Sequence, residues 1–227
     1  MTSAKRRPRL TPDEARNAIL DATLQLYLDK GYLGTSTDEI ASLSGVSKQT
    51  IYRHFNDKDD LIRAAMQRLI AAAEDQGADS FERLAESDNL ADDLEVFAKQ
   101  HLIDIIQPEI MRMRRLIIAE VDRFPDVARA WYEAAPKRAH HKLAETFKRL
   151  EERGLLLVED PLLAAEQFNW LILSIPMNRA MFDSDSVFDT SRHQEYAEAA
   201  VRVFLAAYSI DRTTRDGLCR STHSSDG

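Results

Sequence analysis

Residues 36–55, STDEIASLSGVSKQTIYRHF, place two short helices only three residues apart. Ser36 and Glu39 have the spacing of a capping box, in which each side chain accepts a hydrogen bond from the other residue's backbone N–H. Gly45 favours the left-handed backbone conformation that ends a helix. Two helices separated only by residues 44–46 predict a helix-turn-helix, in which the first helix supports the second at the protein surface.

The second of these helices carries polar side chains on almost its whole outward arc. At 100° per residue, Ile51 and Phe55 fall together and face the core, while Gln49 and Arg53 point the opposite way. Lys48 and Tyr52 flank them on one side, and Thr50 and His54 flank them on the other. Residues 46–55 contain no acid, although the chain has a formal charge of −8. This pattern predicts a helix that lies in a DNA major groove; an ordinary exposed polar helix is the other interpretation.

The rest of the chain predicts helices and no strands. Thr11 to Glu14 form another capping-box pattern, with Pro12 at the first helical position, and Gly31 is expected to end that helix. Asp57 can cap a helix that runs to about Gln76. Seven Gly and seven Pro are too few for the many turns of a β-sandwich or barrel. Further helices are expected at about 89–107, 108–122, 125–134, 136–153, 161–182 and 191–210.

The expected fold class is all-α, with an N-terminal three-helix helix-turn-helix DNA-binding domain and a C-terminal helical bundle that binds a ligand and dimerises. The ranges are a basic disordered arm at 1–10, the DNA-binding domain at 11–60, the regulatory and dimerisation domain at 61–210 and a disordered tail at 211–227. Residues 1–58 carry nine Lys and Arg against seven Asp and Glu. The arm, with Lys5, Arg6, Arg7 and Arg9, has two interpretations: a DNA contact or a solubilising tail.

Composition points to a soluble cytoplasmic protein without a membrane segment. Cys219 is the only cysteine and suits a reducing compartment. The basic start is followed by no apolar core of a secretory signal, and no apolar run reaches the roughly 18 residues of a membrane span. His140-His141 and the pair His101 and Asp104 lack metal-ligand spacing, so neither a metal nor a cofactor is expected. No phosphate loop, nucleophile elbow or Cys/His dyad is visible, which argues against an enzyme.

Residues 11–62 closely resemble the N-terminal DNA-binding domain of the TetR family of bacterial transcription regulators. The resemblance lies in ILDATLQLYLDKGYLGTSTDEIASLSGVSKQTIYRHFNDKDDLI, where about ten positions agree in order and spacing over fifty residues. Farther on, RLIIAEVDRFPDVARAWYE and RGLLLVEDPLLAAEQFNWLIL resemble the regulatory domain of one broad branch of the family. The resemblance implies a homodimer that binds a palindromic operator as a repressor and is released by a small ligand.

The resemblance also assigns roles to the DNA-facing residues. It implies that Lys48, Gln49 and Thr50 contact base edges from the start of the second helix of the helix-turn-helix, the recognition helix. Lys can donate to guanine, Gln can bond adenine at two atoms, and the Thr methyl can meet a thymine methyl. The resemblance also implies phosphate contacts by Tyr52, His54 and Lys58, and Thr37 can make another; such contacts fix the register of the helix without reading the sequence. The expected DNA-binding residues are Thr37, Lys48, Gln49, Thr50, Tyr52, Arg53, His54 and Lys58.

The segments 161–182 and 191–210 are apolar almost all round, so each must be covered on more than one face. A four-helix interface with a second chain would cover them, as the resemblance also implies; burial in a monomer core is the alternative. The expected interface residues are Phe168, Leu171, Ile175, Val203, Phe204 and Tyr208. Only a dimer can set two recognition helices about 34–36 Å apart, one turn of DNA.

An effector pocket should lie among the central helices, because Met and aromatic side chains suit an adaptable apolar cavity. The same residues also fill ordinary cores. The expected lining is Phe97, His101, Met113, Ile117, Phe124, Trp131, Trp170 and Met177. The expected partners are an operator in double-stranded DNA, a second copy of the chain and a largely apolar small molecule. The alternative function is a helix-turn-helix scaffold that acts as a protein-interaction adaptor, or a regulator without a ligand.

Overall fold

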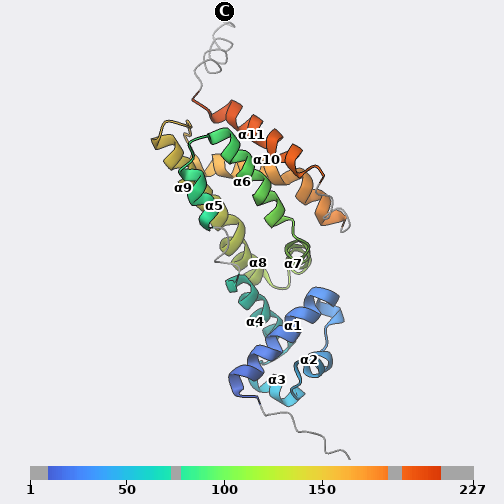
Figure 1. Ribbon diagram of the computed structural model, residues 1–227. Helices are drawn as coiled ribbons and strands as arrows, with labels where there is room; N and C mark the ends of the chain where they lie inside the picture. The colour runs from blue at the N-terminus through green and yellow to red at the C-terminus, as the bar shows by residue number, and fades with distance from the viewer. Residues whose placement is uncertain (1–9, 73–77, 184–190, 211–227) are drawn as a thin grey trace, which may run out of the picture. The chain divides into compact units, whose positions relative to one another are not determined.

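A computed structural model describes residues 10–72, 78–183 and 191–210, and it is helical with no strand in those ranges (Figure 1). The expected basic arm, the C-terminal tail and Cys219 lie outside the described residues, apart from Leu10. The chain forms two compact units, of which the first comprises residues 1–74 and 112–134 and the second the remainder. In the described part, no helix combines the length and apolar character needed to cross a bilayer.

The first unit is built on four helices near the N-terminus, drawn blue to teal in Figure 1. The expected caps are present: Thr11 with Glu14 and Ser36 with Glu39 form complete capping boxes, and Ser47 accepts a hydrogen bond from the Thr50 N–H. The helices of the unit are α1 (Pro12–Gly34), α2 (Thr37–Ser44), α3 (Lys48–His54), α4 (Lys58–Ala72), α7 (Pro108–Ala119) and α8 (Pro125–Tyr132), although α7 begins in the second unit.

Apolar side chains from α1 to α4 form one core. Ile19, Ile40 and Leu61 are completely buried in it, and Ile51 of α3 is 1% exposed. Since α3 has only seven residues, it has too few backbone hydrogen bonds to be stable alone. Burial of Ile51 and Phe55 against the other helices therefore fixes the position of α3.

The α1 helix does not end at Gly31 as expected. Gly31 has φ +68° and ψ −173°, so it kinks the helix, and one further turn runs to Gly34. Glycine tolerates this backbone conformation because it has no Cβ. The kink directly precedes Tyr32, and the next helix starts after Ser36.

The second unit contains the remaining helices and a larger core. Phe147, Phe168 and Phe204 are fully buried there, with ring centroids 4.6–5.8 Å apart. Helices α10 and α11 lie side by side (Figure 1). The elements are α5 (Ala78–Ala85), α6 (Leu90–Ile105), a π-helical segment (Glu133–Lys137) that begins in the first unit, α9 (Arg138–Glu152), α10 (Pro161–Phe182) and α11 (His193–Tyr208).

Two other features of the fold differ from the sequence expectations. The α5 helix was not predicted, and Pro136 does not start a helix but lies inside the π-helical segment. In the compact units, α4, α7 and α8 group with the N-terminal helices. The functional ranges 11–60 and 61–210 stay a prediction.

Candidate nucleic-acid interface

The outer face of α3 is exposed while its inner face is buried. Ile51 and Phe55 are 1% and 4% exposed, whereas Lys48, Gln49, Tyr52 and Arg53 are all exposed. The polar arc expected from the sequence is therefore present on this helix. Thr50 and His54 are half-buried at its edges.

The start of α2 and the exposed face of α3 are joined by polar contacts. The Lys48 ammonium pairs with the Asp38 carboxylate at 2.6 Å, and the Tyr52 hydroxyl donates to the Thr37 hydroxyl at 3.5 Å. The side chains of this ion pair stay 47% and 76% exposed. Both contacts connect residues of α2 and α3 that could face a DNA backbone together. Asp38 adds a negative charge to that surface, and this role was not predicted from the sequence.

The Thr50 hydroxyl lies 2.9 Å from the Ser47 hydroxyl, within hydrogen-bond distance at the helix cap. Its methyl group is the part left for an apolar contact with a base. The side chain of Gln49 has no protein partner among the described residues, so both of its polar atoms can serve a base edge. Gln49 is therefore suited to hydrogen bonds with a base, and the adjacent Thr50 is suited to an apolar contact.

Lys58 and His54 are less available to phosphate than the sequence suggested. The Lys58 ammonium donates to the Tyr32 carbonyl at 2.5 Å and lies 4.0 Å from the centre of the Tyr32 ring. The Nε2 atom of His54 is buried and has no hydrogen-bond partner among the described residues. Lys58 therefore already holds α4 to the end of α1, which is a structural role.

Tyr32 is the centre of a polar cluster that links α1, α4 and the end of α7. Its hydroxyl donates to Asp59 at 2.5 Å, and this hydrogen bond is the main reason why the pKa of Tyr32 is raised. The Arg123 guanidinium lies 3.9 Å from the ring centre on Tyr32 and 3.5 Å from the Asp59 carboxylate. Arg123, in the segment that follows α7, thus contacts both α1 and α4.

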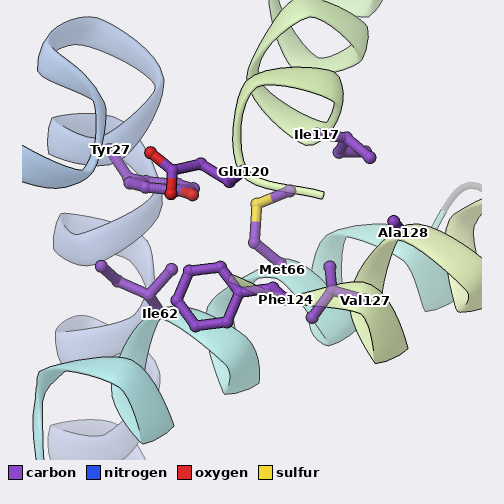
Figure 2. A pocket seen from close by; sticks show the side chains of 8 residues that line it. All are labelled: Tyr27, Ile62, Met66, Ile117, Glu120, Phe124, Val127 and Ala128. Atoms are coloured by element: carbon purple, nitrogen blue, oxygen red, sulfur yellow. The ribbon is translucent and has the colours of Figure 1, made fainter. Parts of the chain in front are cut away.

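A small cavity of about 10 Å³ lies within the first unit, between α1, α4, α7 and α8 (Figure 2). Burial raises the pKa of Tyr27, and the Glu120 carboxylate beside it acts in the same direction. Of the eight expected ligand residues, only Ile117 and Phe124 line this cavity. Its lining is Tyr27, Ile62, Met66, Ile117, Glu120, Phe124, Val127 and Ala128.

The other expected ligand residues are divided between the units. In the second unit, His101 stacks on Phe97 and lies 2.9 Å from the Asn169 side-chain oxygen. Trp170 lies on α10, where 47% of it is exposed. Met113 and Trp131 of the first unit and Met177 of the second are buried, but none of them lines the cavity.

Six exposed apolar side chains on α10 and α11, the exposed row, include three of the six expected interface residues. Leu171, Ile175 and Val203 are 39%, 61% and 52% exposed. The expectation for Phe168 and Phe204 is wrong, because both are fully buried in the core of their own chain. Tyr208 is half-buried, and its hydroxyl donates to Gln167 at 2.6 Å. The row also contains residues that were not predicted for it, namely Leu163, Trp170 and Phe182.

In the part of the chain that the structure describes, no three His, Cys, Asp or Glu residues gather in a way that could hold a metal ion. His140 is buried near Glu166, with 3.9 Å between Nδ1 and the carboxylate. Burial lowers the pKa values of His140 and His101, so burial favours their neutral forms.

A short helix with an exposed polar arc, supported by a second helix across a tight turn, defines the class of helix-turn-helix DNA-binding regulators. The comparison with known proteins narrows this class. A family model described as bacterial regulatory proteins of the tetR family matches residues 19–65. A second model, described as the C-terminal domain of AefR-like transcriptional repressors, matches residues 92–210.

A solved TetR-family regulator from Mesorhizobium loti MAFF303099 is 34% identical, covers 89% of this chain and all of its own, and superposes with a TM-score of 0.78. The flavonoid-responsive regulator FrrA is 28% identical, with a TM-score of 0.64 and coverage of 88% and 99%. The chain belongs to the TetR family of bacterial transcription regulators. This is a family of regulators rather than enzymes, and its members bind DNA operators and dimerise.

Curated relatives match over shorter stretches. The transcriptional activator FasR of Mycolicibacterium smegmatis is 42% identical over 66 residues, which is 29% of this chain and 30% of FasR. The regulator TtgR of Pseudomonas putida is 28% identical over 116 residues, or 51% of this chain and 52% of TtgR. These matches thus span between about a third and half of each relative's length, and they include an activator.

Proposed function

We propose that the protein is a homodimeric repressor that binds a palindromic operator through α3 and leaves it when a small, largely apolar molecule binds. The exposed polar arc of α3 above the buried Ile51 and Phe55 is the observation that carries the DNA-binding part. The match to a domain described as that of repressors supports repression. The alternatives are a protein-interaction adaptor that has lost DNA contact and a regulator without a ligand.

Base contacts are assigned to Lys48, Gln49 and Thr50. Phosphate contacts are assigned to Thr37 and Tyr52, which lie together at the start of α2 and on the exposed face of α3. Free N–H groups at the start of α2 favour an anion at Thr37. Arg53 points outward beside Gln49 and completes the arc.

The exposed row on α10 and α11 is the proposed dimer surface. Large apolar side chains gathered on one face of a chain mark an interaction site. The other face of each helix is already occupied by the core, so this row is what a second chain would cover. A dimer related by two-fold symmetry would use the same row on both chains.

A mobility-shift titration against the promoter next to the protein's own gene tests this function. Gln49→Ala should weaken binding by about 5- to 150-fold at the specific site, because a lost bidentate base contact costs roughly 1–3 kcal/mol. Its binding to unrelated DNA should stay unchanged. The control is Gln67→Ala, which changes an exposed Gln of α4. Equal binding of wild type and Gln49→Ala to the promoter would contradict the assignment.

A further inference from the structure

Arg114 of α7 and Trp131 of α8 form a contact within the first unit that the proposed function does not use. The Arg114 guanidinium carbon lies 4.7 Å from the centre of the Trp131 ring. Trp131 is 8% exposed, and Arg114 is half-buried. Stacking of this kind contacts the face of the indole ring, but it leaves the N–H groups at the edges of both side chains without an acceptor.

One buried N–H group of each side chain has no hydrogen-bond partner in the described part of the chain. The Nε atom of Arg114 and the Nε1 atom of Trp131 are both buried, and neither makes a hydrogen bond to any described residue. Arg114 also has no ion pair there, whereas Arg63 and Arg112 of the same unit pair with Asp126 and Asp29. Burial lowers the pKa of Arg114, and no neighbouring acid opposes this effect.

Unpaired buried donors beside an uncompensated cation are rare in folded proteins, because each group loses its hydration without a replacement. Both side chains only donate, so the missing partner must be an acceptor. A guanidinium matches the two oxygens of a carboxylate, and one unopposed positive charge fits a monoanion better than a phosphate that carries about two charges.

We propose that Arg114 and Trp131 bind the carboxylate of a small molecule whose remaining part is apolar. This proposal rests on the proposed effector-dependent function and specifies the chemistry of the effector. The guanidinium holds the carboxylate, and the indole N–H donates to one of its oxygens. The orphaned donors become satisfied only when the ligand is bound.

The cavity of Figure 2 indicates where the apolar part goes. Ile117 follows Arg114 by three residues on α7, and Val127 and Ala128 precede Trp131 by about one turn on α8, so these cavity residues are the next along the same helix faces. Glu120 also lines the cavity and repels a second carboxylate, which directs the charged end toward Arg114.

The cavity of about 10 Å³ holds at most about one water molecule. An apolar chain can therefore enter only if α7 and α8 move away from α1 and α4. The segment that follows α7 carries Arg123, which contacts Tyr32 and Asp59. Entry of the ligand would thus disturb the cluster that ties this segment to the helix after α3.

The test uses the full chain, without DNA, and three probes of similar length: decanoate, decanamide and decyltrimethylammonium. Trp170→Phe leaves Trp131 as the only tryptophan, so its fluorescence reports on the site. Decanoate should change this fluorescence saturably, with an affinity at least tenfold higher than that of either other probe. Calorimetry on the unmodified chain should rank the affinities of the three probes in the same order.

Arg114→Met retains the apolar stem and removes the charge, and it should weaken decanoate at least tenfold while leaving decanamide unchanged. Arg129→Met, which changes an exposed Arg of α8, is the matched control and should bind like wild type. Equal affinities for decanoate and decanamide, or an unchanged decanoate affinity in Arg114→Met, would overturn the proposal. A fall in the thermal midpoint of Arg114→Met with unchanged decanoate affinity would assign Arg114 to stability instead.

Operator binding is measured separately, so the two proposals can fail independently. If Gln49→Ala binds DNA like wild type, the DNA assignment fails while the decanoate result stands. If decanoate binds at Arg114 and operator affinity does not change, the carboxylate site is supported and its regulatory consequence is rejected.

Discussion

At the residue scale, an acid on the proposed DNA-binding surface should limit how much Lys48 contributes to DNA affinity. Asp38 pairs with Lys48 at 2.6 Å and remains 76% exposed. A lysine that neutralises a phosphate releases a counterion, but one already neutralised by a carboxylate releases less. Asp38 is therefore expected to reduce non-specific attraction to DNA and leave more of the discrimination to Gln49 and Thr50.

Asp38→Asn should raise DNA affinity and steepen the slope of log K against log salt concentration by about one. The effect should be similar for operator and unrelated DNA, because it acts on charge rather than on base reading. Fluorescence anisotropy at four salt concentrations measures both quantities. Asp122→Asn makes the same charge change at an exposed position after α7 and should have little effect. Equal slopes for wild type and Asp38→Asn would remove Asp38 from this role.

Substitution of Lys58 can distinguish a structural role from a DNA contact. Its ammonium is bonded to the Tyr32 carbonyl and stacked on the Tyr32 ring. Lys58→Met should lower the free energy of unfolding by about 1–2 kcal/mol, measured by urea denaturation. The salt slope of DNA binding should stay the same. If instead the slope falls by about one and stability does not change, Lys58 contacts phosphate as the family resemblance implies.

Which site residues the sequence could reveal depends on what each side chain touches. The exposed arc of α3 follows from the periodicity of one helix, so Gln49 and Arg53 were placed correctly on its outer face. The roles of Asp38, Tyr32 and Arg114 depend on partners between 10 and 91 positions away along the chain. Periodicity cannot identify such partners, which exist only after the helices pack.

At the scale of elements, the capping residues were predicted correctly because they act over three residues. The α1 and α2 capping boxes and the Ser47 cap are all present. The short α5 helix was missed, since eight residues carry only two turns of apolar pattern. The expectation for Pro136 was wrong, because this proline lies inside the π-helical segment between α8 and α9 and not in the first turn of a helix.

Gly31 offers a test of the kink in α1. A Cβ at this position would meet no atom within 4 Å, so substitution affects only the backbone. Gly31→Ala should therefore destabilise the protein by about 1–3 kcal/mol through strain at φ +68° and ψ −173°. Chemical denaturation measures the change. Ala130→Gly, on the exposed side of α8, provides a control for the effect of a Gly/Ala exchange alone. An unchanged unfolding midpoint for Gly31→Ala would mean that the chain relaxes at the kink.

At the scale of the whole molecule, two desolvated histidines, the half-buried His101 and the buried His140, should make stability depend on pH. His101 and His140 have lowered pKa values in the folded chain, because burial disfavours the charged ring. Below about pH 6.5 the unfolded chain binds protons that the folded chain does not, so stability falls as the pH falls. Asp104 acts to raise the pKa of His101, and Glu166 acts to raise the pKa of His140, whereas His141 acts to lower the pKa of His140. Burial is the largest effect on both pKa values.

The unfolding free energy should therefore decrease between about pH 6.5 and 5, by about 1.4 kcal/mol for each unit by which a histidine pKa is lowered. Urea denaturation at several pH values measures it. His101→Gln with His140→Gln should flatten the dependence in this range. His141→Gln removes an exposed histidine next to His140 and should retain most of the dependence. A pH-independent wild type would show that neither ring is held neutral.

The exposed row on α10 and α11 is the proposed dimer surface, so operator binding should depend on it. Ile175 and Val203 are 61% and 52% exposed, and a dimer would bury both. Ile175→Asp with Val203→Asp places charges in that interface, where they would be desolvated without partners. Sedimentation should then show single chains. Operator affinity should fall by several orders of magnitude, because a single chain holds only one recognition helix and loses the effective concentration of the second.

The matched control is Val96→Asp, at a site on α6 that is 67% exposed and lies outside the row. It should remain a dimer with wild-type operator affinity, since its charge stays in water. Binding to a single half-site separates two causes of failure. If the double variant binds one half-site as a wild-type chain does, its recognition helix is intact and only the pairing has been lost. If the double variant sediments as a dimer, the row on α10 and α11 is not the interface, and another surface must set the spacing of the two α3 helices.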